Sequence, residues 1–384
     1  MSPRDKVAYG NRSFSGNAPT HSSYLTDLVA SVHRFGHQQS GRLSIFGAQT
    51  RVDCSNDCFP YTFDEKVDQD AVVAEVLMMV RGISNVRGLN ALGIHTLDAF
   101  AVKPDTGVTF ATTLEKKGLI TALQAPHIVG NFDEDIVGEL GVSHGLLWRS
   151  WPKSTSEINR LTIQRTVAEL PSDLNASLAK SYAELPKEDS TDTSLETWLL
   201  THYYSVFDQL NELVNKLKSG NYLQPFLVTA YSPEFEPIDA YAPDVNVMLG
   251  RSSYFPKAHA FQCYVATPKE PGGRPRLSLK VSVTSLDLIN EAPHVLSTYA
   301  LLLHLLAHTV SMDVDELIAD LGDAYLLDAD VETLFTADLL MGNGTPLSRI
   351  RINPGQRDLF QMTFDDFSIT SLSTLEDEHH VDSE

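Results

Sequence analysis

The most regular pattern in the chain is a pair of segments that mix apolar and polar residues, followed by a long apolar segment. Phe255 to Val265 combines aromatic with small apolar residues, and Leu277 to Val283 alternates leucine and valine with polar residues. Both patterns predict half-buried strands. Pro271-Gly272-Gly273 predicts the turn between them, and residues 295–310 predict a helix that is apolar on almost every side. We therefore expect a strand hairpin and a central helix at the core of the domain.

Other segments carry either the helical or the strand period. Helices are predicted over 23–37, 68–81, 158–170, 172–185 and 195–219, and a strand over 43–52. Residues 313–340 combine helical and strand-like features. The segment 195–219 has the clearest helical period, with apolar residues at steps of three and four, Thr193 and Glu196 as a capping box and Gly220 as a stop. Its apolar stripe packs either against the parent domain or against a protein partner.

The amino-acid composition and the net charge limit which classes of protein and ligand are possible. The chain has 384 residues, is 42% hydrophobic and carries 50 acidic against 29 basic side chains, which gives a formal charge of -21. This charge opposes binding to nucleic acids and to anionic membranes. We expect a flexible arm over 1–23, one domain over 24–370 with an inserted segment at about 153–220, and a disordered acidic tail over 371–384.

The cysteines and the absence of a leader sequence predict a cytoplasmic, soluble protein. Cys54, Cys58 and Cys263 do not form a disulfide framework, and the first two alone are a weak zinc signal. No charged and then apolar leader opens the chain. The helix predicted over 295–310 is too short for a bilayer and is interrupted by His304 and His308.

Several motifs, in order, cover most of residues 40–340. The longest read FPKAHAFQCYVA from Phe255, RLSLKVSVTSLD from Arg276 and APHVLSTYALLLHLLAH from Ala292, and shorter matches begin at Gly41, Arg81 and Gly138. Together they resemble the core motifs of thymidylate synthases and phage pyrimidine hydroxymethylases. The resemblance implies an α+β fold with a large mixed sheet and packed helices, and a dimer formed through the sheet. Fold alone does not establish activity.

The resemblance places the reaction's nucleophile directly before His259. In that family a cysteine thiolate adds to C6 of the pyrimidine, which activates C5 for a one-carbon donor. Here the position holds Ala258, which has no reactive atom. Cys263 lies five residues further along the same strand, and from the strand period we expect it on the opposite face, as a core residue.

The family's other nucleotide contacts are also replaced at most matching positions. Two positions are retained, Ser285 for the nucleotide and Asp287 for a folate ring, and Asp287 is equally suited to cap the next turn. The replaced positions are His37, Gln224, Pro225, Val283 and Thr284 for phosphate, Val295 for the pyrimidine edge, and Tyr325 and Leu327 for the sugar. Tyr325 is the remaining candidate for a sugar contact.

Candidate proton carriers remain at three positions. The resemblance assigns Glu75 and His144 to the reactive edge of the base, and His259 follows the replaced nucleophile. A buried carboxylate or a histidine is able to move protons near neutral pH. The alternatives are a helical glutamate that reaches water and a polar loop histidine. Of the aromatic pair that stacks on folate only Phe100 is present, because Leu97 replaces the other member.

Two histidines at helical spacing require a separate interpretation. His304 and His308 lie four residues apart, which is compatible with a metal site, but the HExxH pattern is absent. We therefore expect buried, hydrogen-bonded histidines and no metal.

The sequence predicts a thymidylate synthase fold that has lost its chemistry. Simultaneous replacement of the nucleophile, the phosphate ligands and the base contact predicts a non-catalytic binding, structural or regulatory protein without a cofactor. It is expected to form a homodimer or a heterodimer with a homologue, and 195–219 is the candidate surface for another protein. The alternative is a divergent C5-methyltransferase or hydroxymethylase of pyrimidine nucleotides that uses tetrahydrofolate.

Overall fold

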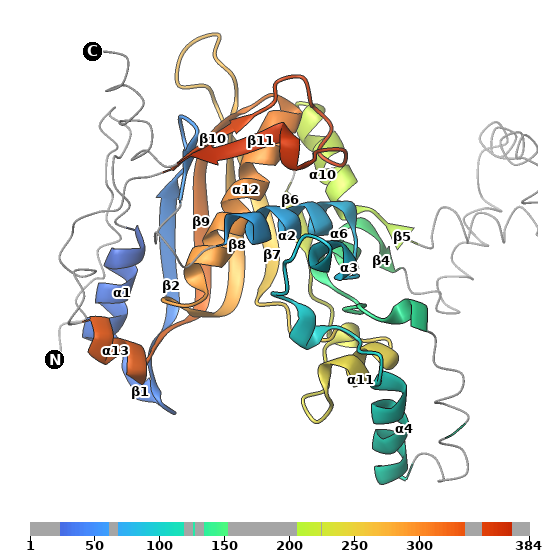
Figure 1. Cartoon of the computed structure of the whole chain (residues 1–384). Helices are drawn as coiled ribbons and strands as arrows, with labels where there is room; N and C mark the ends of the chain where they lie inside the picture. Colours follow the sequence, from blue (N-terminus) through green and yellow to red (C-terminus); the bar gives the residue numbers. More distant parts are fainter. Residues whose placement is uncertain are drawn as a thin grey trace, which may run out of the picture.

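The structure, a computed structural model, describes residues 24–60, 68–118, 126, 134–152, 206–223, 225–334 and 348–370 (Figure 1). Its helices are α1 (Tyr24–Phe35), α2 (Gln69–Arg81), α3 (Arg87–Asn90), α4 (Thr106–Lys116), α6 (His144–Arg149), α10 (Gln209–Lys218), α11 (Pro243–Met248), α12 (Ala292–Val310) and α13 (Asp328–Leu334). Short 3-10 helices are η1 (Asp98–Phe100), η2 (Glu134–Ile136), η3 (Pro233–Phe235) and η5 (Phe364–Asp366). The predicted arm, residues 153–205 of the insertion and the predicted tail lie outside the described residues.

Eleven strands are described, and six of them form one mixed sheet. They are β1 (His37–Gln39), β2 (Arg42–Asp53), β3 (Cys58–Phe59), β4 (Trp151–Pro152), β5 (Val206–Phe207), β6 (Phe226–Thr229), β7 (Ala258–Ala266), β8 (Arg276–Asp287), β9 (Asp313–Leu327), β10 (Ser348–Ile352) and β11 (Phe367–Thr370). The large sheet has the order β1-β2-β9-β8-β7-β6, with β8 and β9 parallel and the other neighbours antiparallel. Parallel neighbours need a crossover connection, which α12 supplies. The α+β class is confirmed.

The central helix lies where the sequence predicted it. Helix α12 runs beside the sheet, against β8, β9 and α2 (Figure 1). Leu301, Leu303, Leu305 and Leu306 are fully buried, which explains why the helix is apolar all round. It begins at Ala292, slightly before the predicted start, because a proline such as Pro293 is tolerated in the first turn of a helix.

Helices α1 and α2 and strand β2 also match their predictions. The Asp68 side chain accepts a hydrogen bond from the backbone N–H of Ala71 at 3.1 Å and so caps the start of α2. Gly82 ends α2 in the left-handed conformation, with φ 74°. The inward faces of both helices join the main core.

The helix predicted over 195–219 is wrong at its start. Val206–Phe207 form β5, which pairs with β4, and α10 begins only after Asp208. The Asp208 carboxylate accepts from the backbone N–H of Asn211 at 2.9 Å, so a local cap and a strand pairing interrupt the helical period. Residues 193–205, with the predicted capping box, lie outside the described residues.

The apolar stripe of α10 is buried in the parent domain. Leu210, Leu213, Val214 and Leu217 belong to the main core, and the helix contacts α6, β6 and α12. Of the two alternatives for this stripe, packing against the parent domain is therefore confirmed for the described part.

A β-bulge at the start of β7 changes the predicted alternation. Ala258 pairs with Val283 but Ala260 pairs with Ser282, so His259 is an extra residue in the strand. The bulge reverses the alternation after it, and Ala258 and Cys263 both belong to the same core cluster. The expectation that Cys263 faces away from Ala258 is thus wrong. The strand also begins at Ala258 rather than at Phe255.

A second, smaller core lies beside the sheet domain. It is formed by one side of α2 with Leu89, Ile94 and Leu140, and Phe100 and Tyr254 pack against it. Helices α4 and α11 contact each other and lie away from the large sheet (Figure 1). Among the helices of the described ranges, none combines the length and apolarity that crossing a bilayer requires.

Candidate functional site

The candidate residues from different elements gather where β7 begins and β8 ends. Ala258 opens β7 and pairs with Val283 near the end of β8, and Asp287, the last residue of β8, is adjacent to Tyr325 of β9. Helix α2 contributes Glu75, and helices α6 and α12 contact α2. The fold therefore brings most of the residues implied by the resemblance to one end of the large sheet.

His144 is bound to the position of the expected nucleophile. Its Nε2 lies 3.0 Å from the backbone oxygen of Ala258, and because a carbonyl only accepts, Nε2 carries the proton. Its Nδ1 lies 3.4 Å from the hydroxyl of Tyr254. Burial lowers the pKa of His144 to about 4, so the ring is neutral at pH 7. It is a half-buried, hydrogen-bonded residue of α6.

Tyr254 connects His144 with the predicted folate-stacking residue. Its ring centroid lies 5.0 Å from that of Phe100 and 6.0 Å from that of His144. Burial, reinforced by the negative charge of Glu75, raises the pKa of the Tyr254 hydroxyl. Phe100 therefore already packs against a protein ring, in a tilted arrangement and at the centroid distance that aromatic pairs prefer.

Glu75 makes two hydrogen bonds within the protein. One carboxylate oxygen accepts from the hydroxyl of Thr96 at 2.5 Å, and the other lies 2.9 Å from Nε2 of His294 in the first turn of α12. Its side chain is 13% exposed, so the alternative of a helical glutamate that reaches water is wrong. Sequence reasoning missed His294, because no local pattern links residues that are 219 positions apart.

Asp287 caps the turn after β8. One oxygen accepts from the backbone N–H groups of Ile289 and Asn290 at 2.9 and 3.0 Å, and the other from the amide of Asn290 at 3.0 Å. The residue is 4% exposed. The capping alternative is confirmed, and both oxygens of the carboxylate already have donors.

The chain just before Ala258 is fixed by a salt bridge. Lys257 binds the carboxylate of Glu291, which also accepts from the backbone N–H of Asp287 at 3.2 Å. Ala258 itself is 6% exposed and presents a methyl group at this point. The lysine charge next to the bulge is thereby neutralised by a carboxylate of the protein.

The predicted nucleotide contacts on β8 and β9 lie beside this network, because Tyr325 pairs with Asp287. Ser285 pairs with Asp323 across the two strands and is half-buried. The guanidinium of Arg42 lies 4.6 Å from the ring centroid of Tyr325 and binds Asp323 at 2.8 Å. Burial raises the pKa of Tyr325. Tyr325, the predicted candidate for a sugar contact, is therefore covered by an arginine of its own chain.

Two polar atoms beside the bulge have no partner among the described residues. They are Nδ1 of His259 and Nε1 of Trp148, both removed from solvent. Burial also lowers the pKa of the His259 ring, which is half-buried. Buried donors and acceptors are normally satisfied, so these atoms are where water or a ligand would bind.

Cys263 and the histidine pair of α12 have structural roles. Burial raises the pKa of the Cys263 thiol to about 12, which keeps it protonated and unreactive. His304 binds the backbone oxygen of Cys58 at 3.0 Å, and His308 that of Gln356 at 2.7 Å. Within the described ranges no three metal-ligating side chains lie close enough to hold an ion.

Comparisons with known proteins agree with the motifs. Residues 23–377 match the family model described as thymidylate synthase. A curated relative, the thymidylate synthase of Saccharomyces cerevisiae, is 24% identical over 334 residues, which cover 86% of this chain and 84% of the relative. The match thus extends over nearly the whole length of both proteins.

Proposed function

Because the chain belongs to the thymidylate synthase family, we propose that it uses this fold for binding or assembly and not for one-carbon transfer to a pyrimidine. Covalent activation of the ring needs a nucleophile at the start of β7. The methyl group of Ala258 offers none, and Cys263 is a protonated core thiol.

The observation that carries this proposal is the internal pairing of the site. The carboxylates of Glu75 and Asp287 and the ring of His144 bind protein atoms, and Lys257 binds Glu291. A site that recognises a nucleotide keeps such groups available, because discrimination comes from polar groups that the ligand alone satisfies. A nucleotide entering here has to displace these existing bonds.

Calorimetric titration with dUMP, dCMP and tetrahydrofolate tests the proposal. We expect no binding, or binding only at millimolar concentration. The same protein, incubated with 5-fluoro-dUMP, should show no mass increase, and an Ala258→Cys variant should show none either because the phosphate contacts are also replaced. Micromolar binding of dUMP or dCMP, or a covalent adduct of the unmodified protein, contradicts the proposal.

Assembly is the use that we propose for the retained fold. A dimer through the large sheet is the arrangement that the family resemblance implies, and the inserted residues before β5 are the candidate surface for a further partner. Light scattering of the full chain measures whether it forms this dimer. For the partner surface, deletion of 155–204 retains β5, which pairs with β4, and α10, which belongs to the core. It should leave self-association unchanged while removing partner binding.

A second candidate function is favoured by one specific contact. His294, bound to Glu75 at 2.9 Å, forms a histidine and carboxylate pair of the kind that transfers protons, and Nδ1 of His259 is unpartnered in the described residues. In that case Glu75, His144 and His259 carry protons and tetrahydrofolate binds near Phe100. Release of tritium from C5 of labelled dUMP, abolished by Glu75→Gln, would establish this function over the first.

A further inference from the structure

A hollow of about 820 Å³ lies at the opposite end of the large sheet from the candidate site. It begins at Arg276, the first residue of β8, whereas the candidate site contains Asp287, the last. Eleven strand steps of about 3.3 Å place these ends roughly 35 Å apart. The hollow is therefore independent of the pyrimidine chemistry discussed above.

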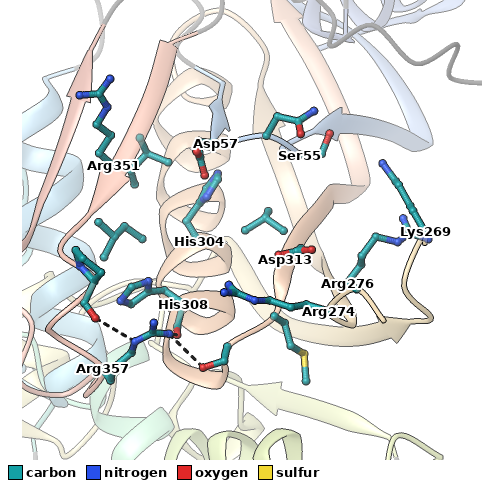
Figure 2. A pocket seen from close by; sticks show the side chains of 18 of the residues that line it. Ser55, Asp57, Lys269, Arg274, Arg276, His304, His308, Asp313, Arg351 and Arg357 are labelled. Atoms are coloured by element: carbon teal, nitrogen blue, oxygen red, sulfur yellow. Dashed lines mark hydrogen bonds between the residues drawn. The ribbon is translucent and has the colours of Figure 1, made fainter. Parts of the chain in front are cut away.

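Basic side chains from separate segments surround this hollow. Lys269, Arg274 and Arg276 come from the β7–β8 connection and the start of β8, and Arg351 and Arg357 come from β10 and the loop after it. Figure 2 shows the two groups on opposite sides, with His304 between them. Arg276 binds the carboxylate of Asp315 at 2.5 Å, so four cations around the hollow keep their charge, in a chain with 29 basic and 50 acidic residues. Three carboxylates, of Asp57, Glu270 and Asp313, also line it.

Most of these cations are not neutralised by the protein. Within the described ranges, Lys269, Arg274 and Arg351 make no ion pair, although carboxylates are the more abundant charge in the chain. The cations Arg51 and Lys280 on the large sheet each bind a carboxylate, at 2.6 and 3.0 Å. In Figure 2 Arg274 and Arg357 extend toward each other across the hollow, and Lys269 and Arg351 lie at its edges. Unpaired cations grouped in this way are a usual arrangement for binding phosphate.

One arginine is held in place without losing its charge. The guanidinium of Arg357 donates to the backbone oxygen of His308 and to the hydroxyl of Ser311, both at 3.1 Å, and to the backbone oxygen of Pro354 at 3.2 Å. Dashed lines in Figure 2 mark hydrogen bonds of Arg357. These acceptors are neutral, so the positive charge remains available to an anion. The contacts fix the group beside the end of α12.

The base of the hollow is apolar and rigid. Ile350 and Met312 are 2% and 6% exposed, and His304 is fixed by its bond to the backbone of Cys58. Small-molecule sites combine such apolar walls with a few placed polar groups, within roughly 300 to 1,000 Å³. The size and the mixture suit an organic molecule with charged groups better than a single inorganic ion.

We propose that this hollow binds a small molecule that carries two or more linked phosphates. The phosphates contact Arg274 and Lys269 on one side and Arg351 and Arg357 on the other, and the organic part lies over Ile350 and Met312. Binding does not require the pyrimidine site, so the proposal holds whether or not the chain is a catalyst.

Calorimetry of the full chain with ATP and with tripolyphosphate tests this proposal. We expect saturable binding at one site per chain, weakened by salt, in the wild type. An Arg274→Gln, Arg351→Gln double variant should bind at least about tenfold more weakly, because charge-assisted contacts to phosphate are lost on both sides. The matched control is Lys103→Gln, Lys116→Gln, which removes two exposed cations elsewhere and should bind as the wild type does.

The two anions distinguish the sources of phosphate. Tighter binding of ATP indicates an organic phosphate that uses the apolar base, and equal binding indicates free polyphosphate. The proposal is overturned if neither anion binds at millimolar concentration, or if the Arg274→Gln, Arg351→Gln variant binds as well as the lysine control. A parallel titration with a long single-stranded RNA overturns it if RNA binds and neither anion does. Thermal unfolding of each variant establishes that a loss of binding is not a loss of folding.

Discussion

The two ends of the large sheet differ in what their charged groups contact. At the candidate pyrimidine site Glu75, Asp287 and Lys257 bind protein atoms, whereas at the hollow Lys269, Arg274 and Arg351 have no ion pair in the part of the chain that the structure describes. Groups that bind each other contribute to stability, and groups that do not are available to a ligand. The family resemblance therefore indicates a ligand site at one end of the sheet, and the unpaired cations indicate a ligand site at the other end.

Acidification should give the largest change in stability, because it acts on one histidine at each end, the half-buried His144 and the buried His304. Burial lowers the pKa of His144 and of His304 from 6.5 to about 4. The unfolded chain therefore takes up the protons first, and stability is complete above about pH 6.5 and decreases as the pH falls toward 4. Between pH 7 and 5 each histidine should account for about 2 kcal/mol of lost unfolding free energy, about 4 kcal/mol together.

Urea unfolding at several pH values measures this loss. A His144→Gln variant keeps a donor for the Ala258 oxygen and should lose about half of the pH dependence. An unchanged slope in that variant would show that His144 does not titrate with unfolding.

Replacing Asp287 should show that a hydrogen-bonded, buried carboxylate contributes more to the unfolding free energy than an exposed carboxylate does. Asp287→Ala removes the acceptor of three hydrogen bonds in a buried turn and should lower the unfolding free energy by about 2 to 3 kcal/mol. Asp313→Ala at the exposed edge of the hollow is the control, with a change within about 0.5 kcal/mol. Equal effects of the two substitutions would remove the distinction between the two ends.

Glu75→Gln tests the pairing with His294 in the same way. The amide has only one acceptor oxygen, so one of the bonds to Thr96 and His294 becomes weaker, and we expect a loss of about 1 to 2 kcal/mol. Glu270→Gln in the hollow should have no measurable effect on chemical denaturation, because Glu270 is exposed. If Glu75→Gln stabilises the protein instead, the carboxylate is strained for function and the second candidate function gains support.

The smallest change in stability is expected when a single exposed cation is replaced. Arg51→Gln breaks the contact with Glu316 at 2.6 Å and should cost about 0.5 kcal/mol, as exposed ion pairs do. Arg274→Gln removes no ion pair that the structure describes and should leave the thermal midpoint unchanged or slightly higher. A clear loss of stability in Arg274→Gln, without ligand, would mean that its charge serves the fold.

The sequence by itself determined the hairpin, the central helix, α1 and α2, because each follows from a pattern of neighbouring residues. The resemblance of its ordered motifs indicated the family. It also indicated that Cys263 is a core residue and that Asp287 suits a turn. Periodicity failed at Val206–Phe207, where pairing with β4 overrides a helical pattern, and at His259, where one bulged residue reverses the alternation.

Only the tertiary structure decided which charges meet. Glu75 pairs with His294 across 219 positions, and the hollow combines segments from Ser55 to Arg357. No local period encodes these contacts, because they depend on how the helices and a second sheet, with the order β11-β10-β3, pack around α12. The sequence therefore specified the elements and the alanine that precedes His259, and packing specified which polar groups are occupied and which remain available.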